Sequence, residues 1–157
     1  MRWTWATQSL SKLRQAVFVI AILALPAFAE LGGNVTTVQN DQVRMKGTVR
    51  VTAGEGFAIH EITTPTGTAV REYVNPAGTV FGVAWQGPWK PDLRQLLGVY
   101  FDQYVQASQE NKKHGRSPLQ VQSGSLVVES GGHPRSFSGR AFLPQMMPSN
   151  VTAGMIQ

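Results

Sequence analysis

Short runs of alternating apolar and polar residues, separated by turns that contain glycine and proline, dominate the chain after residue 43. Alternation with a period of two is typical of β-strands that bury one face. The pattern predicts an antiparallel sheet of about six to seven strands. The predicted strands span Met45–Thr52, Phe57–Thr63, Ala69–Val74, Thr79–Gln86, Leu119–Gln122, Leu126–Ser130 and Arg135–Leu143.

Two similar turns, Thr64–Gly67 and Asn75–Gly78, join three of these strands and share the pattern X-Pro-X-Gly. Proline sets φ at the first turn position, and glycine accepts a left-handed conformation at the third. This pattern indicates a three-residue hairpin loop, which fixes the pairing of the flanking strands.

The predicted register divides the side chains between two mostly apolar faces, because side chains alternate along a strand. In this register His60 pairs with Glu72, and Tyr73 pairs with Phe81. One face collects Phe57, Ile59, Glu61, Arg71, Tyr73, Phe81, Val83 and Trp85. The opposite face collects Ala58, His60, Ile62, Val70, Glu72, Val74, Val80, Gly82 and Ala84.

One amphipathic helix is predicted over residues 92–109. Asp92 is a suitable N-cap, and Gln95 stands where a capping box needs it. The apolar residues recur with a period of 3.6, as in Leu93, Leu96, Leu97, Tyr100, Phe101, Tyr104 and Val105. The order of strands, helix and strands predicts the α+β class, with the helix packed on one face of the sheet.

Residues 1–29 have the pattern of a secretory signal peptide. A basic start precedes the apolar run Ala16–Leu25, and Ala27-Phe28-Ala29 forms a small-x-small cleavage triplet. The run is about half of the roughly 20 residues that span a bilayer, so we expect cleavage after Ala29. The remaining chain divides into an N-terminal arm (30–43), a single α+β domain (44–143) and a C-terminal tail (144–157).

Removal of residues 1–29 changes the meaning of the net charge of +5. The segment contains three of the 14 basic residues and none of the 9 acidic ones, so residues 30–157 carry +2. The short basic cluster Lys112–Arg116 reads as a solvated loop. Because no basic stripe follows one face, we expect no nucleic-acid partner.

The most specific chemical grouping is His60 opposite Glu72, with Gly82 leaving room beside them. An imidazole oriented by a carboxylate could act as a general base. The same two residues also fit an ordinary cross-strand charged pair, and no nucleophile accompanies them. We expect no catalytic residue; His60, Glu72 and His133 are the remaining candidates. We expect neither a metal nor a cofactor.

The aromatic face is the better candidate for binding. Tyr73, Phe81 and Trp85 form an apolar surface that only about 128 residues are available to cover, and such a surface can bind a partner. Trp89, between two prolines, either is an exposed recognition residue or folds onto the edge of the core.

Several runs together match the pattern of one family. The most specific are Val70-Arg71-Glu72-Tyr73-Val74 and Ser130-Gly131-Gly132-His133, and they are accompanied by Leu31-Gly32-Gly33, Pro91–Gly98 and Gly139-Arg140-Ala141. On these motifs the sequence resembles the bacterial exported family catalogued as domain of unknown function 2844. The resemblance covers nearly all of residues 30–157 and implies a bacterial exported protein, but no activity and no functional residue.

These observations favour a periplasmic or secreted protein that acts as a non-catalytic binding or assembly module of the cell envelope. Its partner would be a protein or another envelope component, and it would meet the membrane only through the signal peptide before cleavage. The alternative is an unrecognised enzyme that uses His60 and Glu72.

Overall fold

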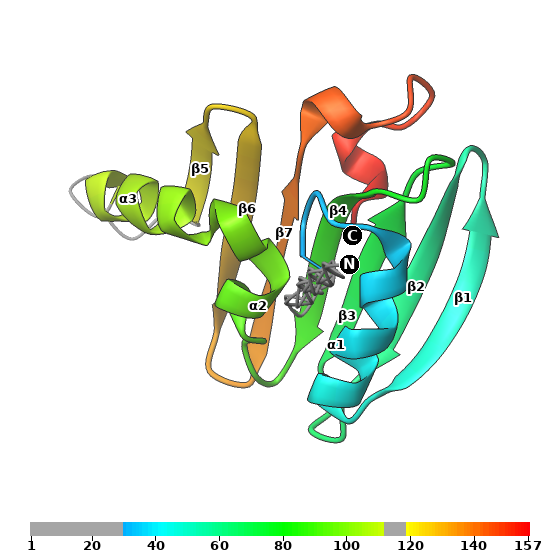
Figure 1. Ribbon diagram of the computed structural model, residues 1–157. Coiled ribbons are helices and arrows are strands. Elements are labelled where there is room, and N and C mark those ends of the chain that lie inside the picture. Colours follow the sequence, from blue (N-terminus) through cyan, green and yellow to red (C-terminus); the bar gives the residue numbers. More distant parts are fainter. Residues whose placement is uncertain (1–29, 112–118) are drawn as a thin grey trace, which may run out of the picture.

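Seven antiparallel strands form one sheet in the order β1-β2-β3-β4-β7-β6-β5 (Figure 1). The computed structural model describes residues 30–111 and 119–157, so the predicted signal peptide and the basic cluster Lys112–Arg116 lie outside the described residues. The α+β class and the antiparallel sheet are confirmed. The strands are β1 (Thr48–Gly54), β2 (Phe57–Thr63), β3 (Ala69–Val74), β4 (Val80–Gly87), β5 (Leu119–Ser123), β6 (Leu126–His133) and β7 (Ser136–Phe142).

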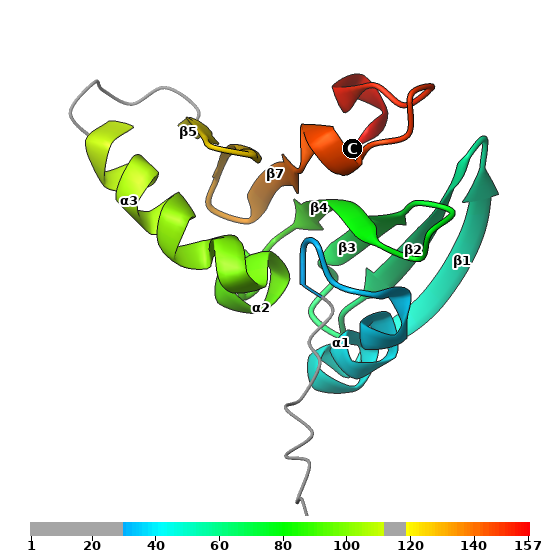
Figure 2. The ribbon, with the colours of Figure 1, turned by 45° about the horizontal axis from the view of Figure 1, so that its top comes forward.

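Helices cover one face of this sheet, and the C-terminal segment covers part of the other (Figure 2). The helices are η1 (Val35–Thr37), α1 (Val38–Met45), α2 (Leu93–Leu97), η2 (Gly98–Tyr100) and α3 (Phe101–Asn111). The C-terminal segment contains the short turns η4 (Pro144–Met146) and η5 (Ala153–Met155). None of the helices in the described ranges is long and apolar enough to span a membrane.

The predicted helix over residues 92–109 is present, but it bends at Gly98. This residue has φ 51° and ψ −121° and ends α2, and a Cβ placed there would collide with the side chain of Glu30. Glycine is therefore required both for the conformation and for the close approach. The bend lets α2 bury Leu96 and Leu97 over the sheet, while α3 lies along β5.

The extended arm predicted over residues 30–43 is instead helical and packed. Leu31 donates its backbone N–H to the carbonyl oxygen of Leu96, and Gly32 donates to that of Val80. Leu31 is 0% exposed and Val38 is 2% exposed, so this segment belongs to the core. Residues 30–43 were predicted to be extended because most of them are polar. The helix that they contribute to buries only a narrow apolar stripe.

The register between β2 and β3 is confirmed, with His60 opposite Glu72. The predicted register between β3 and β4 is wrong from Tyr73 onward. Val74 pairs with Val80, yet Tyr73 pairs with Gly82, so Phe81 is the extra residue of a β-bulge. A one-residue shift moves every following side chain to the other face.

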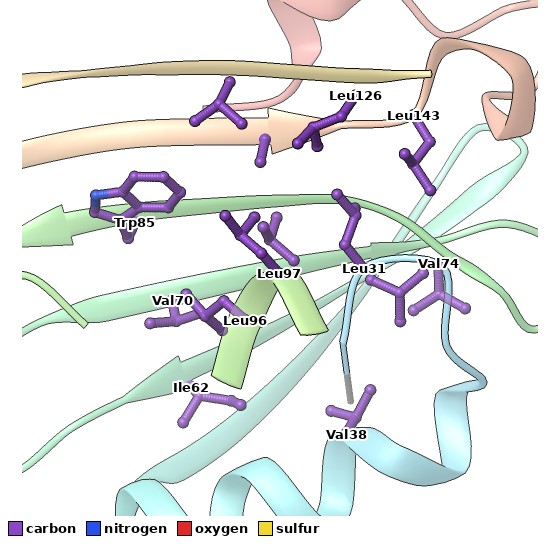
Figure 3. Packing of buried hydrophobic residues seen from close by; sticks show 14 of the residues in the cluster. Leu31, Val38, Ile62, Val70, Val74, Trp85, Leu96, Leu97, Leu126 and Leu143 are labelled. Atoms are coloured by element: carbon purple, nitrogen blue, oxygen red, sulfur yellow. The ribbon is translucent and has the colours of Figure 1, made fainter. Parts of the chain in front are cut away.

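The bulge explains the composition of the two cores. Val83 and Trp85, predicted to lie beside Phe81, join the larger core on the helix face with residues such as Leu97 and Leu126 (Figure 3). The smaller core lies on the opposite face, between the sheet and the C-terminal segment. Its buried members are Tyr73, Phe81, Ala84, Phe142, Val151 and Ile156.

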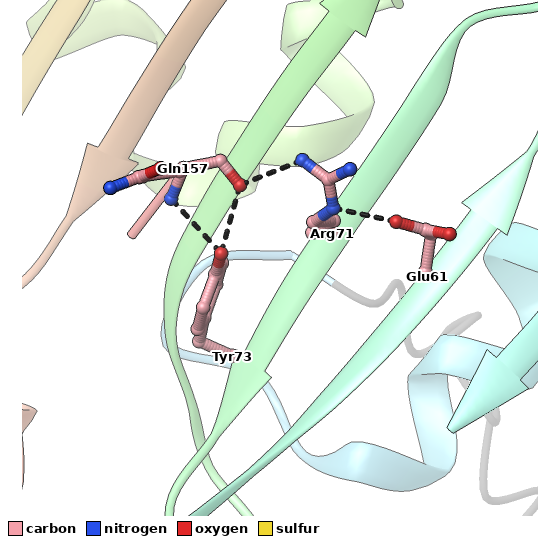
Figure 4. Close-up of polar contacts among 4 residues, drawn as sticks. All are labelled: Glu61, Arg71, Tyr73 and Gln157. Carbon is pink, nitrogen blue, oxygen red and sulfur yellow. Dashed lines mark hydrogen bonds and ion pairs between the residues drawn. The ribbon is translucent and has the colours of Figure 1, made fainter. Parts of the chain in front are cut away.

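Polar contacts fasten the C-terminal segment to the sheet (Figure 4). The Tyr73 hydroxyl donates to the main-chain oxygen of Gln157 (2.9 Å) and accepts from its backbone N–H (3.0 Å). Arg71 donates to the same main-chain oxygen at 3.0 Å and pairs with Glu61 at 2.6 Å. The segment is thus an integral layer of the fold.

Candidate functional site

Three of the four predicted binding aromatics are buried. Tyr73 is 1% exposed, Phe81 0% and Trp85 2%. The C-terminal segment covers the first two, and the bulge turns Trp85 into the helix-side core. The open aromatic face expected from the sequence is therefore absent from the described structure. Trp89 differs sharply, because it is 62% exposed.

The structure does not bring the three catalytic candidates together. His60 and Glu72 are opposite each other, but Glu72 is 0% exposed, and no ion pair joins the two side chains in the described part of the chain. Val83, not Gly82, is the β4 neighbour of Glu72. His133 is exposed at the end of β6, four strands from β2, or about 19 Å at the usual strand spacing.

Glu72 faces a different group, the carboxyl of Asp41 on α1. Both residues are 0% exposed. Burial, together with the charge of Asp41 and a hydrogen bond between the two carboxyls, raises the pKa of Glu72 to about 9. Burial raises the pKa of Asp41 to about 6, against the lowering effect of a hydrogen bond from Gln95. One proton therefore stays between the two carboxyls at neutral pH.

This carboxyl pair joins α1, β3 and α2. Gln95 Nε2 donates to Asp41 Oδ1 at 2.6 Å, while Glu72 accepts no hydrogen bond from any NH donor among the described residues. Because the pair is sealed from solvent, its geometry suits a structural contact rather than chemistry on a substrate. Burial also lowers the pKa of the neighbouring His60, which favours its neutral form.

The sequence did not predict Asp41 as a buried residue, because residues 30–43 were interpreted as a polar, extended arm. A signal was present: Val38, Asp41 and Met45 recur at i, i+3 and i+7, the spacing of one helix face. An acidic residue in the middle of that stripe argued against burial. Its burial is explained by two groups from other elements, the Gln95 amide that donates to it and the Glu72 carboxyl on β3.

A pocket of about 270 Å³ lies beside Trp89. Three segments form it: the end of α1, the β2–β3 turn, and the connection from β4 to α2. Its lining combines three basic side chains, threonine hydroxyls and the exposed indole. The residues are Arg44, Met45, Lys46, Thr64, Pro65, Thr66, Thr68, Trp89, Lys90, Pro91, Asp92 and Gln95.

Two contacts position Trp89 at this pocket. The hydroxyl of buried Thr68 donates to the Trp89 carbonyl oxygen at 3.0 Å. Gly87 allows the connection to cross the β2–β3 turn closely, since a Cβ there would lie 2.5 Å from the Thr68 Cα atom. The sequence predicted Trp89 as a candidate, but the turn that holds it comes from a distant part of the chain.

The pocket carries an excess of positive charge. Arg44, Lys46 and Lys90 are exposed, against one acidic residue, Asp92. The Asp92 carboxylate caps α2, accepting from the backbone N–H groups of Arg94 (2.9 Å) and Gln95 (3.3 Å). Lys90 also lies 5.3 Å from the ring centre of Phe137.

A second hollow, of about 510 Å³, lies near β6, β7 and Gln157. Its charged residues, Arg140 and Glu129, pair with each other at 2.7 Å, and Arg140 also donates to the carbonyl oxygens of Ala153 and Ile156. These partners hold the C-terminal segment, so the Trp89 pocket is the stronger candidate for a ligand.

No group of three or more potential metal-ligating side chains occurs in the ranges that the structure describes. Among protein-family models, the one described as "Protein of unknown function (DUF2844)" matches residues 27–156. No curated protein and no solved structure matches the chain.

Proposed function

From the premise that this chain belongs to the DUF2844 family of proteins of unknown function, we propose that it is an exported binding module of the cell envelope, and that it binds its ligand at the Trp89 pocket without catalysing a reaction. The observation that carries the proposal is the contrast in exposure. Trp89 is 62% exposed beside a pocket, whereas Trp85 is 2% exposed in the core.

Exposure of this indole has a cost that binding would offset. Tryptophan is highly buried on average, and it is enriched among the residues that dominate binding energies. Thr68 holds the Trp89 backbone from the β2–β3 turn, so the residue is positioned before a ligand arrives. Such preorganisation reduces the entropic cost of binding.

The alternative, an enzyme that uses His60 and Glu72, gains no support from the geometry. Glu72 is 0% exposed and shares a proton with Asp41, and His133 stands four strands away from His60.

The binding proposal is tested with immobilised protein and an extract of the cell envelope. We expect Trp89→Ala to lose retention of specific envelope components while its far-UV circular dichroism and urea midpoint stay unchanged. Val99→Ala, at a 75% exposed apolar residue outside the pocket, serves as the control and should retain the same components as the parent. Equal retention by the parent and Trp89→Ala would refute the pocket as the binding site.

Export is tested separately. The chain recovered from an expressing bacterium should be found in the periplasm or medium and should begin at Glu30 by N-terminal sequencing. A cytoplasmic chain that still begins at Met1 would contradict the proposal.

A further inference from the structure

Three features of the Trp89 pocket indicate the chemical class of its ligand. The inference from them rests on the proposed function, because it assumes that the pocket binds a ligand. We propose that the pocket binds an acidic sugar, that is, a sugar ring carrying a carboxylate. The volume of about 270 Å³ lies just below the range of pockets for drug-sized molecules. It therefore suits one ring of a longer saccharide rather than a large cofactor.

Charge is the first argument. Three exposed basic residues, Arg44, Lys46 and Lys90, line a small pocket whose one acidic member, Asp92, caps α2. The charge of Arg44 also acts on the buried Asp41 carboxyl, so Lys46 and Lys90 are the main partners for a ligand. Arginine and lysine are the natural partners of a carboxylate. Residues 30–157 carry only +2, so three basic side chains around one pocket are a local concentration of positive charge.

The neutral part of the lining is the second argument. Trp89 offers a flat apolar surface on which a ring can lie. Thr66 offers a hydroxyl in the exposed turn, where its Oγ1 atom lies 3.0 Å from that of Thr64. A few polar groups beside an aromatic surface are the usual means of orienting a small ligand, and hydroxyls match the hydroxyls of a sugar.

The backbone at Lys46 is the third argument. Lys46 follows α1 with φ 50°, a left-handed conformation that glycine adopts without penalty. A lysine there keeps a positive charge at the pocket at a conformational cost. Costly conformations of this kind are found at functional sites.

The probe is a trimer of galacturonic acid, titrated calorimetrically into the purified chain in low salt. Its fully methyl-esterified form has the same rings without the charge and is the matched ligand control. We expect the acid to bind and the ester to bind roughly 5-fold more weakly, since each exposed ion pair contributes a factor of roughly 1.5 to 5. Added salt should weaken binding of the acid but not of the ester.

Protein variants provide the second arm. Lys46→Gly should weaken binding of the trimer roughly 2- to 5-fold and should not unfold the chain, because glycine suits this conformation. Arg135→Gly is the matched control: Arg135 also has a left-handed backbone, with φ 67°, but does not line the pocket. It should leave the dissociation constant of the trimer unchanged.

Three results would overturn the inference: equal affinity for the acid and the ester, equal weakening by Lys46→Gly and Arg135→Gly, or binding of phosphatidylglycerol vesicles or inorganic phosphate without binding of the trimer. If the trimer does not bind but Trp89-dependent retention from envelope extract persists, the acidic-sugar inference fails and the binding proposal stands. If both fail, the pocket is not a ligand site.

Discussion

Glu72 is the residue whose environment departs furthest from the expectation based on the sequence. The Thr64–Gly67 turn correctly predicted that it lies opposite His60, in what looked like a charged pair. In the folded chain it interacts with Asp41, 31 positions earlier, and both carboxyls are 0% exposed. Two buried carboxyls cannot both ionise without a large cost in free energy, so a shared proton becomes part of the fold.

The pH dependence of stability follows from this pair. The folded chain holds the Glu72 proton up to a pKa of about 9, whereas the unfolded chain releases it near 4.5. Between these values the folded state binds more protons, so the free energy of unfolding falls as pH rises. We expect urea unfolding to show this decline from about pH 5 to pH 9, and Glu72→Gln to flatten it because the amide stays neutral.

Glu55→Gln is the control for that measurement, because Glu55 is exposed in the turn between β1 and β2. This variant should show the slope of the parent. A parent chain with constant stability from pH 5 to pH 9 would contradict a proton shared between Asp41 and Glu72.

At the scale of elements, the end of α1 combines a backbone conformation that favours glycine with a lysine that lines the proposed binding pocket. The Lys46 N–H donates to the Val43 carbonyl oxygen, and the Gly47 N–H donates to that of Gln42. This is a Schellman motif with lysine at the left-handed position. A glycine at that position would avoid the steric cost of a side chain, so the helix end is less stable than it could be.

We therefore expect Lys46→Gly to raise the free energy of unfolding by about 0.5–1 kcal/mol, as measured in urea. The same substitution should weaken ligand binding, so stability and binding change in opposite directions. Lys46→Ala removes the charge but keeps the strained backbone and should not stabilise the chain. Equal stabilisation by glycine and alanine would refute the role of the backbone.

The β-bulge at Phe81 is the reason that the predicted division of β4 side chains between the two faces of the sheet is wrong. The Asn75–Gly78 turn correctly predicted Asn75 opposite Thr79, and the Asn75 N–H donates to the Thr79 carbonyl oxygen at 2.9 Å. The register then shifts by one residue within the next few positions. Gly82 is the one signal of an irregularity in the run Val80–Trp85, because a glycine inside a strand often marks a bulge. The run itself is continuously apolar, since both faces of this strand are buried, so no alternation shows where the faces exchange.

At the scale of the whole molecule, the C-terminal segment completes the structure. Ile156 is 0% exposed and packs over Gly82, where a Cβ would lie 3.0 Å from the Ile156 Cδ1 atom. The small residue on the sheet and the large one in the segment are complementary. The segment converts an exposed aromatic face into a second core.

Truncation of this side chain should therefore destabilise the whole fold. We expect Ile156→Ala to lower the free energy of unfolding in urea by about 2–5 kcal/mol, the usual cost of such a change in a core. Met155→Ala, at a neighbouring residue that is 49% exposed, should change it by less than about 0.5 kcal/mol. Similar small effects of both would show that the segment is not part of the core.

The sequence alone determined the features that depend on neighbouring residues. The α+β class, the β2–β3 register and the helix that starts after Asp92 follow from periodicity, turn chemistry and capping, which act over a few positions. The tertiary structure decided which faces are buried, because burial depends on segments that meet from distant parts of the chain. The helix at Val38–Met45, the partner of Glu72 and the cover over Tyr73 and Phe81 all arise in this way. The same reason separates the tryptophans: Trp85 and Trp89 lie four positions apart, yet the fold buries the first and leaves the second beside a basic pocket.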